Sequence, residues 1–416
     1  MSVLKIVGGR RLSGSVRVQG AKNSALPMLA ASVMTEGISV LRNCPALSDV
    51  ETTLEILRHV GCRVYRDGDA VYVDASGPIS PEVPDELMRR MRSSVIFLGA
   101  LLARCGEAAL SLPGGCELGP RPVDLHLLAL RALGAEITEA AGRLCCRAGR
   151  LRGGHIDLPA VSVGATENAM LAACLAEGTT VITGAAREPE IQDLQAFLRA
   201  AGALVSGAGS GVIRIRGVEK LRGAEHRIIP DRIAAATWLA ACASAGGSVR
   251  LYDADPGRCG PILQVLRRMG CSVSTGEGLI TLERRGGLVS PGSVVTRPYP
   301  GFPTDAQPPL MAAALRARGT TVMIETIFEA RYRHVPALRR MGADVRTEGK
   351  TAVIRGVERL RGTETAAADL RGGAALAVAA LAAEGETVLG GLQHVDRGYE
   401  DLAGTLAALG AEVIRI

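Results

Sequence analysis

The sequence predicts an α/β protein with two similar domains, in which the helices lie inside each domain and the sheets outside. Three observations support this prediction. The chain has 416 residues, too many for one core, because hydrophobic cores stop growing near roughly 250–300 residues. A pattern of helix, glycine and strand recurs six times. A second set of helices, rich in alanine and leucine, is apolar on nearly all sides, as expected of interior helices.

The helix-ending glycine defines the repeat. Glycine enters the left-handed conformation freely, so a glycine after a Leu/Arg-rich helical run is the expected end of a helix. Successive copies of this glycine lie 68 to 73 residues apart, and each is followed by a strand-like segment. The copies read ILRHVGCRV, ALRALGAEI, FLRAAGALV, VLRRMGCSV, ALRRMGADV and TLAALGAEV, with glycines at positions 61, 134, 202, 270, 342 and 410.

Upstream of each glycine, an Ala/Leu-rich helix leads through a turn into a β-rich segment, as in LAACLAEGTTVI. The unit is therefore helix, strand, helix, strand, usually with a further strand, as in VIRIRGVEKL. Six units could instead form a solenoid. A period of about 70 residues exceeds the familiar short repeats, however, and a solenoid would need atypical polar end caps. Three units in each of two domains fit better.

The composition excludes several classes of protein. Hydrophobic residues make up 47% of the chain and aromatic residues 3%, so Ala, Leu, Val and Gly must build the core. The ten cysteines show no CxxC pair and no His partner at metal spacing, so we expect reduced core thiols and no zinc site. The N-terminus lacks a signal-peptide pattern, and no run of about 18 apolar residues occurs, so we expect a cytoplasmic protein.

The charge pattern favours a small anionic ligand. The formal net charge is +6, but basic residues lie mostly singly, without the aromatic-interleaved basic stripe of a nucleic-acid surface. Strong, salt-dependent retention on DNA would be the sign of a nucleic-acid binder instead.

Segments peculiar to one repeat are the candidates for chemistry, because the scaffold itself is repeated. In GAKNSALP, Lys22 and Asn23 lie near the start of the first buried helix, where free N–H groups and the helix dipole favour an anion. Alternatively, Asn23 or Ser24 caps this helix and Lys22 is solvated. Arg397, in HVDRGYE, lies in a loop. Such an arginine is usually solvated, but several converging cations would recognise phosphate or carboxylate.

Two aspartates stand where helix caps are expected. Asp305, in PTDAQPP, is predicted to cap the fifth buried helix, and Asp369, in ADLRGGAA, is predicted to cap the sixth, with Arg371 just inside. The segment LSLPGGCELGPRPVDLH places Cys116 between glycines that would permit lid motion. With Arg121 nearby, Cys116 could act as an acid or a nucleophile, or it could be one more apolar thiol in a turn.

Ten segments spread along the whole chain resemble the enolpyruvyl transferases of the UDP-N-acetylglucosamine 1-carboxyvinyltransferase family (enolpyruvyl-UDP-GlcNAc synthase). The resemblance implies two domains joined by a double crossing, each built from three βαβαββ units, with the active site in the cleft between them. Residues 22–229 would form one domain, and residues 1–21 with 230–416 the other. The segments are GAKNSALP, RSSVIFLGALLAR, LPGGCELGPRPVDLH, VSVGAT, AAREPEI, PDRI, FPTDAQ, ETIFEARYRHVPALRRMGA, ADLR and HVDRGYE.

The resemblance implies an activity. The family transfers the enolpyruvyl group of phosphoenolpyruvate to the 3′-hydroxyl of UDP-N-acetylglucosamine by addition and elimination, and releases phosphate. This is the first committed step of peptidoglycan synthesis, and so of cell-wall biogenesis, cell shape and cell division. By the same resemblance the chain would act in the cytoplasm as a monomer on two small-molecule substrates. No cofactor, metal, nucleic acid or membrane is implied.

The resemblance also assigns roles to residues. Cys116 would protonate C3 of phosphoenolpyruvate and would be the thiol that fosfomycin alkylates, while Asp305 would take the proton of the 3′-hydroxyl. Lys22, Arg121 and Arg397 would surround the phosphate and carboxylate of phosphoenolpyruvate. The remaining substrate-binding positions are implied to be Asn23, Arg92, Pro122, Val123, Asp124, Leu125, Ser162, Val163, Gly164, Ile327, Asp369 and Arg371.

The chain departs from the family pattern at three places. Ala160 and Ser48 stand where many members have cations, which could weaken binding of the diphosphate. Pro308 and Pro309 stand where members usually continue into a helix, although proline is tolerated in a first helical turn. Two alternative functions follow from the same fold: an enolpyruvyl transferase acting on shikimate 3-phosphate, and a catalytically silent paralogue that binds UDP-sugar and regulates wall synthesis.

Overall fold

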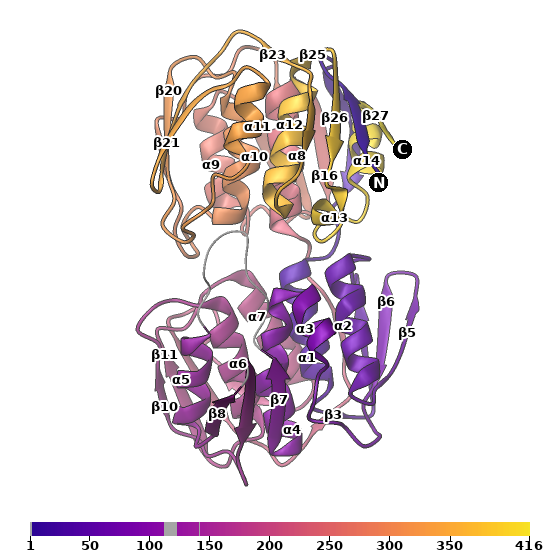
Figure 1. Cartoon of the computed structure of the whole chain (residues 1–416), viewed down its shortest axis with the longest axis vertical. Coiled ribbons are helices and arrows are strands. Elements are labelled where there is room, and N and C mark those ends of the chain that lie inside the picture. Colours follow the sequence, from indigo (N-terminus) through magenta and orange to yellow (C-terminus); the bar gives the residue numbers. More distant parts are fainter. Residues whose placement is uncertain (1, 112–122, 141) are drawn as a thin grey trace. The chain divides into compact units, whose positions relative to one another are not determined.

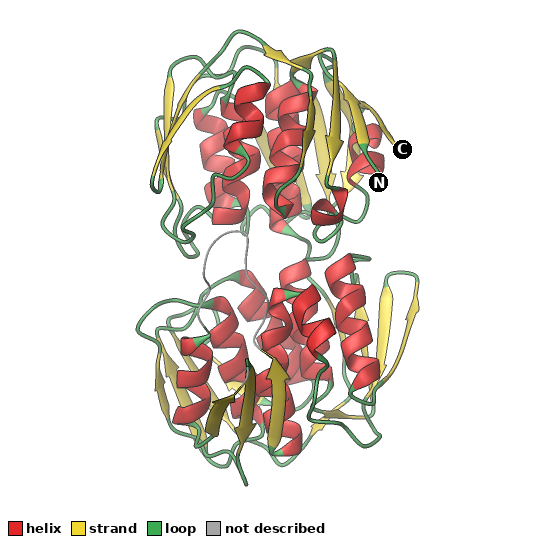
Figure 2. Ribbon diagram, in the orientation of Figure 1, coloured by secondary structure: helices red, strands yellow, loops and turns green. Residues whose placement is uncertain are grey.

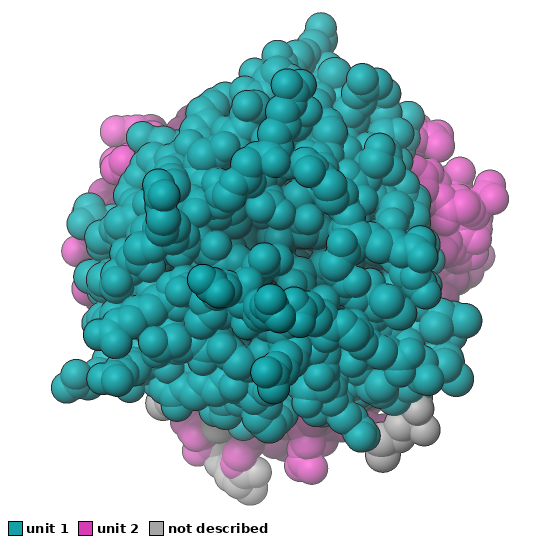
Figure 3. Space-filling view, turned by 90° about the horizontal axis from the view of Figure 1, so that it is seen from above, with its two compact units in different colours: residues 1–19, 117–120, 230–416 teal, residues 20–116, 121–229 magenta. Residues whose placement is uncertain are grey.

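The computed structural model describes residues 2–111, 123–140 and 142–416, except for the side chains of Arg92 and Ala140. These residues form two compact units (Figure 3). Unit 1 contains residues 2–19 and 230–416, and unit 2 contains residues 20–111, 123–140 and 142–229. The chain therefore passes between the units after Gln19 and again after Ile229. The first of these crossings lies two residues before the boundary that the sequence suggested.

Each unit is built around helices that are buried on nearly all sides. In α8, for example, every residue from Arg232 to Ser244 is buried. The three central helices of unit 1 pack against one another, and alanine, with its small side chain, allows this close approach. The central helices are α8 (Arg232–Ala245), α10 (Gln307–Ala314) and α12 (Leu370–Leu381) in unit 1, and α1 (Lys22–Ser32), α4 (Phe97–Cys105) and α6 (Val163–Cys174) in unit 2.

A second set of helices is amphipathic and begins after the strand that follows each central helix (Figure 1). In α9 the buried residues include Ile262, Leu263 and Leu266, the i, i+1, i+4 pattern of one helical face. These helices are α2 (Ser48–His59), α5 (Asp124–Ala132), α7 (Pro189–Ala200), α9 (Gly260–Arg268), α11 (Val335–Arg340) and α14 (Leu402–Ala408). Shorter helical segments are α3 (Asp85–Arg90), η1 (Arg92–Ile96), η2 (Thr304–Ala306) and α13 (Leu392–Val395).

The sheets of unit 2 lie outside its helices (Figure 2). Their strands alternate between buried and exposed residues, as β13 does, because one face covers the helices and the other meets solvent. In spatial order the sheets are β15 (Glu225–Arg227), β4 (Ile38–Arg42), β6 (Ala70–Asp74) and β5 (Arg63–Asp67); β7 (Glu107–Ser111), β9 (Arg143–Arg147) and β8 (Glu136–Ala140); and β10 (His155–Asp157), β11 (Thr179–Thr183), β13 (Val212–Arg216) and β12 (Leu204–Ser206). A two-stranded pair joins β14 (Leu221–Arg222) to β3 (Thr35–Glu36).

Unit 1 repeats this plan with three four-stranded sheets, in each of which one edge strand is parallel to its neighbour. In order they are β17 (Ser272–Gly276), β18 (Leu279–Arg284), β16 (Gly247–Tyr252) and β2 (Leu12–Arg17); β19 (Ser293–Val295), β20 (Thr320–Ile324), β22 (Thr351–Arg355) and β21 (Asp344–Glu348); and β24 (Glu364–Ala366), β26 (Glu386–Gly390), β1 (Leu4–Val7) and β27 (Glu412–Arg415). A short pair joins β23 (Leu360–Arg361) to β25 (Ala383–Glu384).

The N-terminal strand β1 completes the sheet of the last repeat. It lies between β26 and β27, with Leu4 opposite both Leu389 and Arg415. The backbones of Val3 and Ile416 exchange two hydrogen bonds of 2.9 Å. The two ends of the chain are therefore held in one sheet.

The six repeat glycines end helices as predicted. Their φ angles lie between +90° and +107°, a conformation that L-residues with a side chain rarely adopt. The α/β class, the interior helices and the outer sheets predicted from the sequence are confirmed. Among the described residues, no helix is both long and apolar enough to cross a membrane.

Candidate active site

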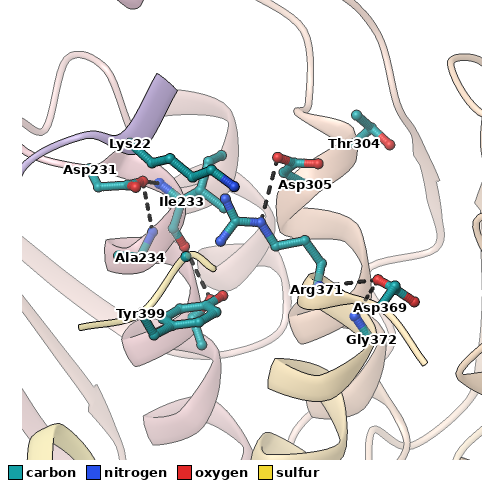
Figure 4. Close-up of polar contacts among 12 residues, drawn as sticks. Lys22, Asp231, Ile233, Ala234, Thr304, Asp305, Asp369, Arg371, Gly372 and Tyr399 are labelled. Carbon is teal, nitrogen blue, oxygen red and sulfur yellow. Dashed lines mark hydrogen bonds and ion pairs between the residues drawn. The ribbon is translucent and has the colours of Figure 1, made fainter. Parts of the chain in front are cut away.

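In unit 1, the carboxylate of Asp305 lies between two buried arginines, Arg331 and Arg371. Figure 4 shows the second of them, Arg371, beside Asp305. Asp305 Oδ1 accepts a hydrogen bond of 2.9 Å from Arg331 Nη2, and Oδ2 lies 3.5 Å from Arg371 Nε. The side chains of Arg331 and Arg371 are 1% and 3% exposed, whereas that of Asp305 is 30% exposed. The acid thus remains accessible while the cations that hold it are buried.

Asp305 does not cap the fifth buried helix, so that prediction is wrong. The helix α10 begins at Gln307, its N-cap residue is Ala306, and no side chain caps it. Asp305 lies one step earlier, in the 3₁₀ turn η2. Its carboxylate meets arginines that are distant in sequence instead of the helix N–H groups. Pro308 and Pro309 lie in the first turn of α10, where their missing N–H groups cost nothing.

Two residues that the sequence analysis did not single out hold Asp305 in position. Arg331 donates from Nε and Nη2 to the carbonyl oxygen of Thr304, at 3.2 and 2.7 Å. Glu325, which is 1% exposed, accepts from the Thr304 hydroxyl, at 3.0 Å for Oε2. Glu325 Oε1 also accepts from the backbone N–H groups of Ile327 and Phe328. One buried carboxylate therefore fixes both η2 and the segment that carries Ile327.

The sequence did contain a signal for these two residues. Glu325 and Arg331 both lie in ETIFEARYRHVPALRRMGA, the longest segment of the resemblance. Their partner Thr304 lies more than 20 residues away, so the local pattern does not reveal the pairing.

Asp369 caps α12, as predicted. Its Oδ1 accepts from the backbone N–H groups of Arg371 and Gly372, at 3.1 and 2.8 Å. Asp231 caps α8 in the same way (Figure 4). Within the described ranges, Oδ2 of Asp369 is buried without a hydrogen-bond partner, as are both ring nitrogens of His334. Burial lowers the pKa of His334 to about 4 despite the opposing effect of Asp369, so the ring is neutral at pH 7.

Arg371 keeps unused hydrogen-bonding capacity. Among the described residues, its buried Nε and Nη1 atoms have no hydrogen-bond partner, although Nε lies near Asp305. The guanidinium carbon lies 5.4 Å from the ring centre of Tyr399, whose hydroxyl pairs with that of Thr237 at 2.8 Å. Burial lowers the pKa of Arg371, but Tyr399 and Asp305 raise it and the net shift is upward. A buried, charged group with unsatisfied donors is suited to an anionic ligand.

Two further predicted site residues, Arg397 and Ile327, belong to unit 1. Arg397 is half-buried between α13 and α14. The neighbouring Gly398 packs against Leu370 at the start of α12, since a Cβ on this glycine would lie 2.7 Å from Leu370 Cδ2. Ile327 follows β20 and is 39% exposed, unusual for a large apolar side chain and suitable for contact with a ligand.

In unit 2, Lys22 is the first residue of α1. Its side chain is buried and not solvated. Its Nζ lies 2.5 Å from Asp49 Oδ2, and the two side chains are only 10% and 4% exposed. The N-cap position is Ala21, without a side-chain hydrogen bond. Of the two interpretations of this segment, the one in which Asn23 or Ser24 caps the helix and Lys22 is solvated is therefore wrong. Asn23 is exposed and Ser24 is buried.

The predicted positions for the nucleotide sugar lie at the starts of two helices in unit 2. Ser162 caps α6, its hydroxyl accepting from the N–H of Ala165 at 3.3 Å, and Val163 and Gly164 begin that helix. Val123 precedes α5, which begins with Asp124 and Leu125. The starts of α5 and α6 supply N–H groups that suit anions.

Four predicted site residues lie wholly or partly outside the residues that the structure describes. Cys116, Arg121 and Pro122 lie outside the described residues. Arg92 begins η1, but its side chain is not described. Among the described cysteines none forms a disulfide, and the described residues contain no group of three His, Cys, Asp or Glu that could hold a metal.

The class of protein follows from comparison with known proteins. The model of the EPSP synthase family (3-phosphoshikimate 1-carboxyvinyltransferase) matches residues 6–406. The chain belongs to this family of enolpyruvyl transferases, and the resemblance drawn from its motifs is confirmed.

Two relatives are similar to this chain over its full length. The chain is 49% identical over 416 residues to "UDP-N-acetylglucosamine 1-carboxyvinyltransferase 2" of Caldanaerobacter subterraneus subsp. tengcongensis, covering all of both chains. It is 45% identical over 417 residues to "UDP-N-acetylglucosamine 1-carboxyvinyltransferase" of Shewanella amazonensis, again covering all of both.

Solved structures show the same fold. The enolpyruvyl transferase NikO from Streptomyces tendae is similar with a TM-score of 0.88 and 28% identity, covering 100% of this chain and 98% of that one. An EPSP synthase from Acinetobacter baumannii gives a TM-score of 0.76 at 22% identity, with full coverage of both chains. At that identity the likeness concerns the fold alone.

Proposed function

We propose that this chain transfers the enolpyruvyl group of phosphoenolpyruvate to the 3′-hydroxyl of UDP-N-acetylglucosamine, with release of phosphate. The observation that carries this proposal is the 49% identity, over the whole chain, to a relative of that activity by name. Shikimate 3-phosphate is the less suitable acceptor, because the full-length relatives at 49% and 45% identity are named for UDP-N-acetylglucosamine. The step would serve peptidoglycan synthesis.

The reaction requires one acid and one base. In the addition step, Asp305 takes the proton of the 3′-hydroxyl while the hydroxyl oxygen bonds to C2 of phosphoenolpyruvate. At the same time Cys116 gives a proton to C3. In the elimination step, the Cys116 thiolate takes a proton back from C3 and the bond from C2 to the phosphate oxygen breaks, so that phosphate leaves with the proton held by Asp305. The accessible Asp305 carboxylate, held by two buried arginines, supports its role as the base.

The substrates carry several negative charges, and the chain offers cations for them. We assign Lys22, Arg121 and Arg397 to the phosphate and carboxylate of phosphoenolpyruvate. The unused donors of Arg371 support an anion beside Asp305, at a position that Asp369 fixes by capping α12. Positioned cations stabilise charge that develops in the transition state without reorganising.

The nucleotide sugar would contact the starts of two helices of unit 2. Ser162, Val163 and Gly164, with Val123, Asp124 and Leu125, present helix starts to its anionic part. We assign Arg121, Pro122, Asp305 and Ile327 to the same substrate, and Asn23 and Arg92 to substrate binding.

We further propose that the protein is a cytoplasmic monomer without a nucleic-acid or membrane partner. Sedimentation at micromolar concentration should give a single species with the mass of one chain. A stable dimer would contradict the proposed monomer.

A phosphate-release assay tests the proposed function. Phosphoenolpyruvate with UDP-N-acetylglucosamine should release phosphate, whereas phosphoenolpyruvate with shikimate 3-phosphate should not. Release only with shikimate 3-phosphate would show the wrong acceptor. Binding of UDP-N-acetylglucosamine without any release would favour the silent regulatory paralogue.

A further inference from the structure

His126 is a buried histidine whose ring faces the start of α6. It lies in α5 and is 8% exposed. A Cβ on Gly164, the second residue of α6, would lie 2.9 Å from His126 Cε1 and 3.2 Å from Nε2. The ring edge that carries Nε2 therefore packs directly against the first turn of the helix. Only glycine leaves room for this approach.

The amide of Asn168 holds the other side of the ring. Asn168 lies in α6 and is fully buried. Its Oδ1 accepts from the N–H of Gly99 at 2.7 Å, and its Nδ2 lies 3.0 Å from the carbonyl oxygen of Val95 and 2.7 Å from His126 Nδ1. One side chain thus joins η1, α4 and α5 to α6.

These contacts determine the protonation of the ring. The Gly99 N–H can only donate, so the oxygen of the Asn168 amide must face it and the NH₂ group must face Val95 and His126. An amide NH₂ group offers hydrogen atoms alone, so Nδ1 of His126 must accept with its lone pair. A neutral imidazole carries one proton, which then lies on Nε2.

The ring is neutral at physiological pH. Burial lowers the pKa of His126 to about 4, and Asp124 opposes this only in part. Within the described ranges, the contact with Asn168 is the one hydrogen bond of the ring. The Nε2–H group is thus a donor available for a ligand, inside a side chain that is more than nine-tenths buried.

We propose that Asn168 is a positioning residue that fixes His126 as its Nε2–H tautomer, and that this N–H donates to a diphosphate oxygen of the nucleotide sugar at the start of α6. The identity of the ligand rests on the proposed function. The helix α6 has 12 residues, and the N–H groups of its first turn point out of the helix toward an anion. A neutral donor adds a hydrogen bond there without adding charge.

The tautomer can be measured directly. Long-range ¹H–¹⁵N correlation spectra of the ¹⁵N-labelled full chain at pH 7 should show His126 as the neutral Nε2–H form, with His126→Gln identifying its signals among those of the six histidines. In Asn168→Asp the new carboxylate can only accept, so a proton should appear on Nδ1. An Nδ1–H tautomer in the wild type would overturn the inference, whatever the enzyme's activity.

Binding tests the role of the donor. Calorimetry should show UDP-N-acetylglucosamine binding about 10-fold or more weakly to His126→Leu, because a hydrogen bond to a charged group is lost. Uridine, which lacks the diphosphate, should bind with affinity changed by less than about twofold. His126→Gln should restore much of the loss, since glutamine can accept from Asn168 and still donate. The exposed His59→Gln serves as the control.

The two proposals fail in distinguishable ways. If wild-type enzyme releases phosphate but His126→Leu binds UDP-N-acetylglucosamine normally, or loses uridine equally, the inference is wrong and the proposed function stands. If the wild type neither binds UDP-N-acetylglucosamine nor releases phosphate, the proposed function is wrong. His126→Leu and His126→Gln keep the inference testable even if Asn168→Asp fails to fold.

Discussion

Cys116 is the thiol on which the proposed chemistry depends. We expect Cys116→Ala to lower turnover by at least about 100-fold, the usual contribution of a general acid, and to abolish labelling by fosfomycin. Binding of UDP-N-acetylglucosamine should change little. Mass spectrometry of the treated protein and the phosphate assay measure these effects.

The other cysteines provide the contrast. Burial raises the pKa of Cys174 to about 12, which leaves almost no reactive thiolate at pH 7. Cys145 is exposed on β9, so Cys145→Ala is the matched control and should remain active and labelled. Labelling that persists in Cys116→Ala would identify a different reactive thiol.

His334 makes the stability of unit 1 depend on pH. Its folded pKa is about 4, whereas an unfolded histidine titrates near roughly 6.5. Between these values the unfolded state holds more protons, so the free energy of unfolding falls as the pH drops from about 6.5 toward 4. The loss for one such group is roughly 3 kcal/mol.

The single tryptophan makes this measurable. Trp238 lies in α8 of unit 1 and packs edge-on against Tyr399, with ring centres 5.6 Å apart. Urea unfolding followed by Trp238 fluorescence should show a shallower dependence on pH for His334→Gln than for the wild type. The exposed His155→Gln, in unit 2, should leave the dependence unchanged. If the free energy of unfolding depends on pH equally in all three proteins, His334 is not the cause of the pH dependence.

Among the elements, the helix-ending Gly270 is a position where backbone conformation alone constrains the residue. Gly270 has a φ of +91°, yet the nearest atom to a Cβ there would lie 3.9 Å away. Gly270→Ala should therefore cost about 1–2 kcal/mol through backbone strain and not through a clash.

The control for this prediction is a glycine of ordinary φ in the same unit. A Cβ on Gly286 would have no neighbour within 4 Å. Gly286→Ala should be neutral or slightly stabilising, because it restricts the unfolded chain. Trp238 fluorescence during urea unfolding compares the two variants, and equal effects would show that the strain argument fails.

How far the sequence predicted the structure depends on the range of the interactions. The glycine stops, the interior helices and the cap by Asp369 are local signals, and all were predictable. Asp305 was predicted as a cap because PTDAQPP fits one locally. Arg331 and Arg371, 26 and 66 residues further along the chain, take its carboxylate instead. Partners so distant in sequence leave no local pattern, so Glu325 and Arg331 were also not identified.

At the scale of the whole molecule, unit 1 depends on its first strand. In β1, Leu4 and Ile6 are at most 1% exposed, and burial of such side chains contributes about 1.5–3 kcal/mol each. Deletion of residues 2–8 would leave β26 and β27 without the strand between them. We expect unit 1 to lose several kcal/mol of stability, seen by Trp238 fluorescence, while hydrogen exchange in unit 2 stays nearly unchanged.

A circular permutant separates the role of the strand from that of the chain end. A short linker from Ile416 to Ser2, with new termini at Gly286, keeps β1 in its sheet. This protein should retain most of the stability of unit 1. A loss as large as that of the deletion would show that the free N-terminus matters, and not the strand.

The place of β1 also sets an order of events during synthesis. Residues 20–229, which contain all of unit 2, emerge from the ribosome as one continuous stretch and can fold at once. Strand β1 is made before unit 2, yet its neighbours β26 and β27 follow more than 370 residues later. At about 5–20 residues per second, its buried face waits tens of seconds for them. The apolar side chains of β1 are therefore ones that a chaperone would need to protect until unit 1 is complete.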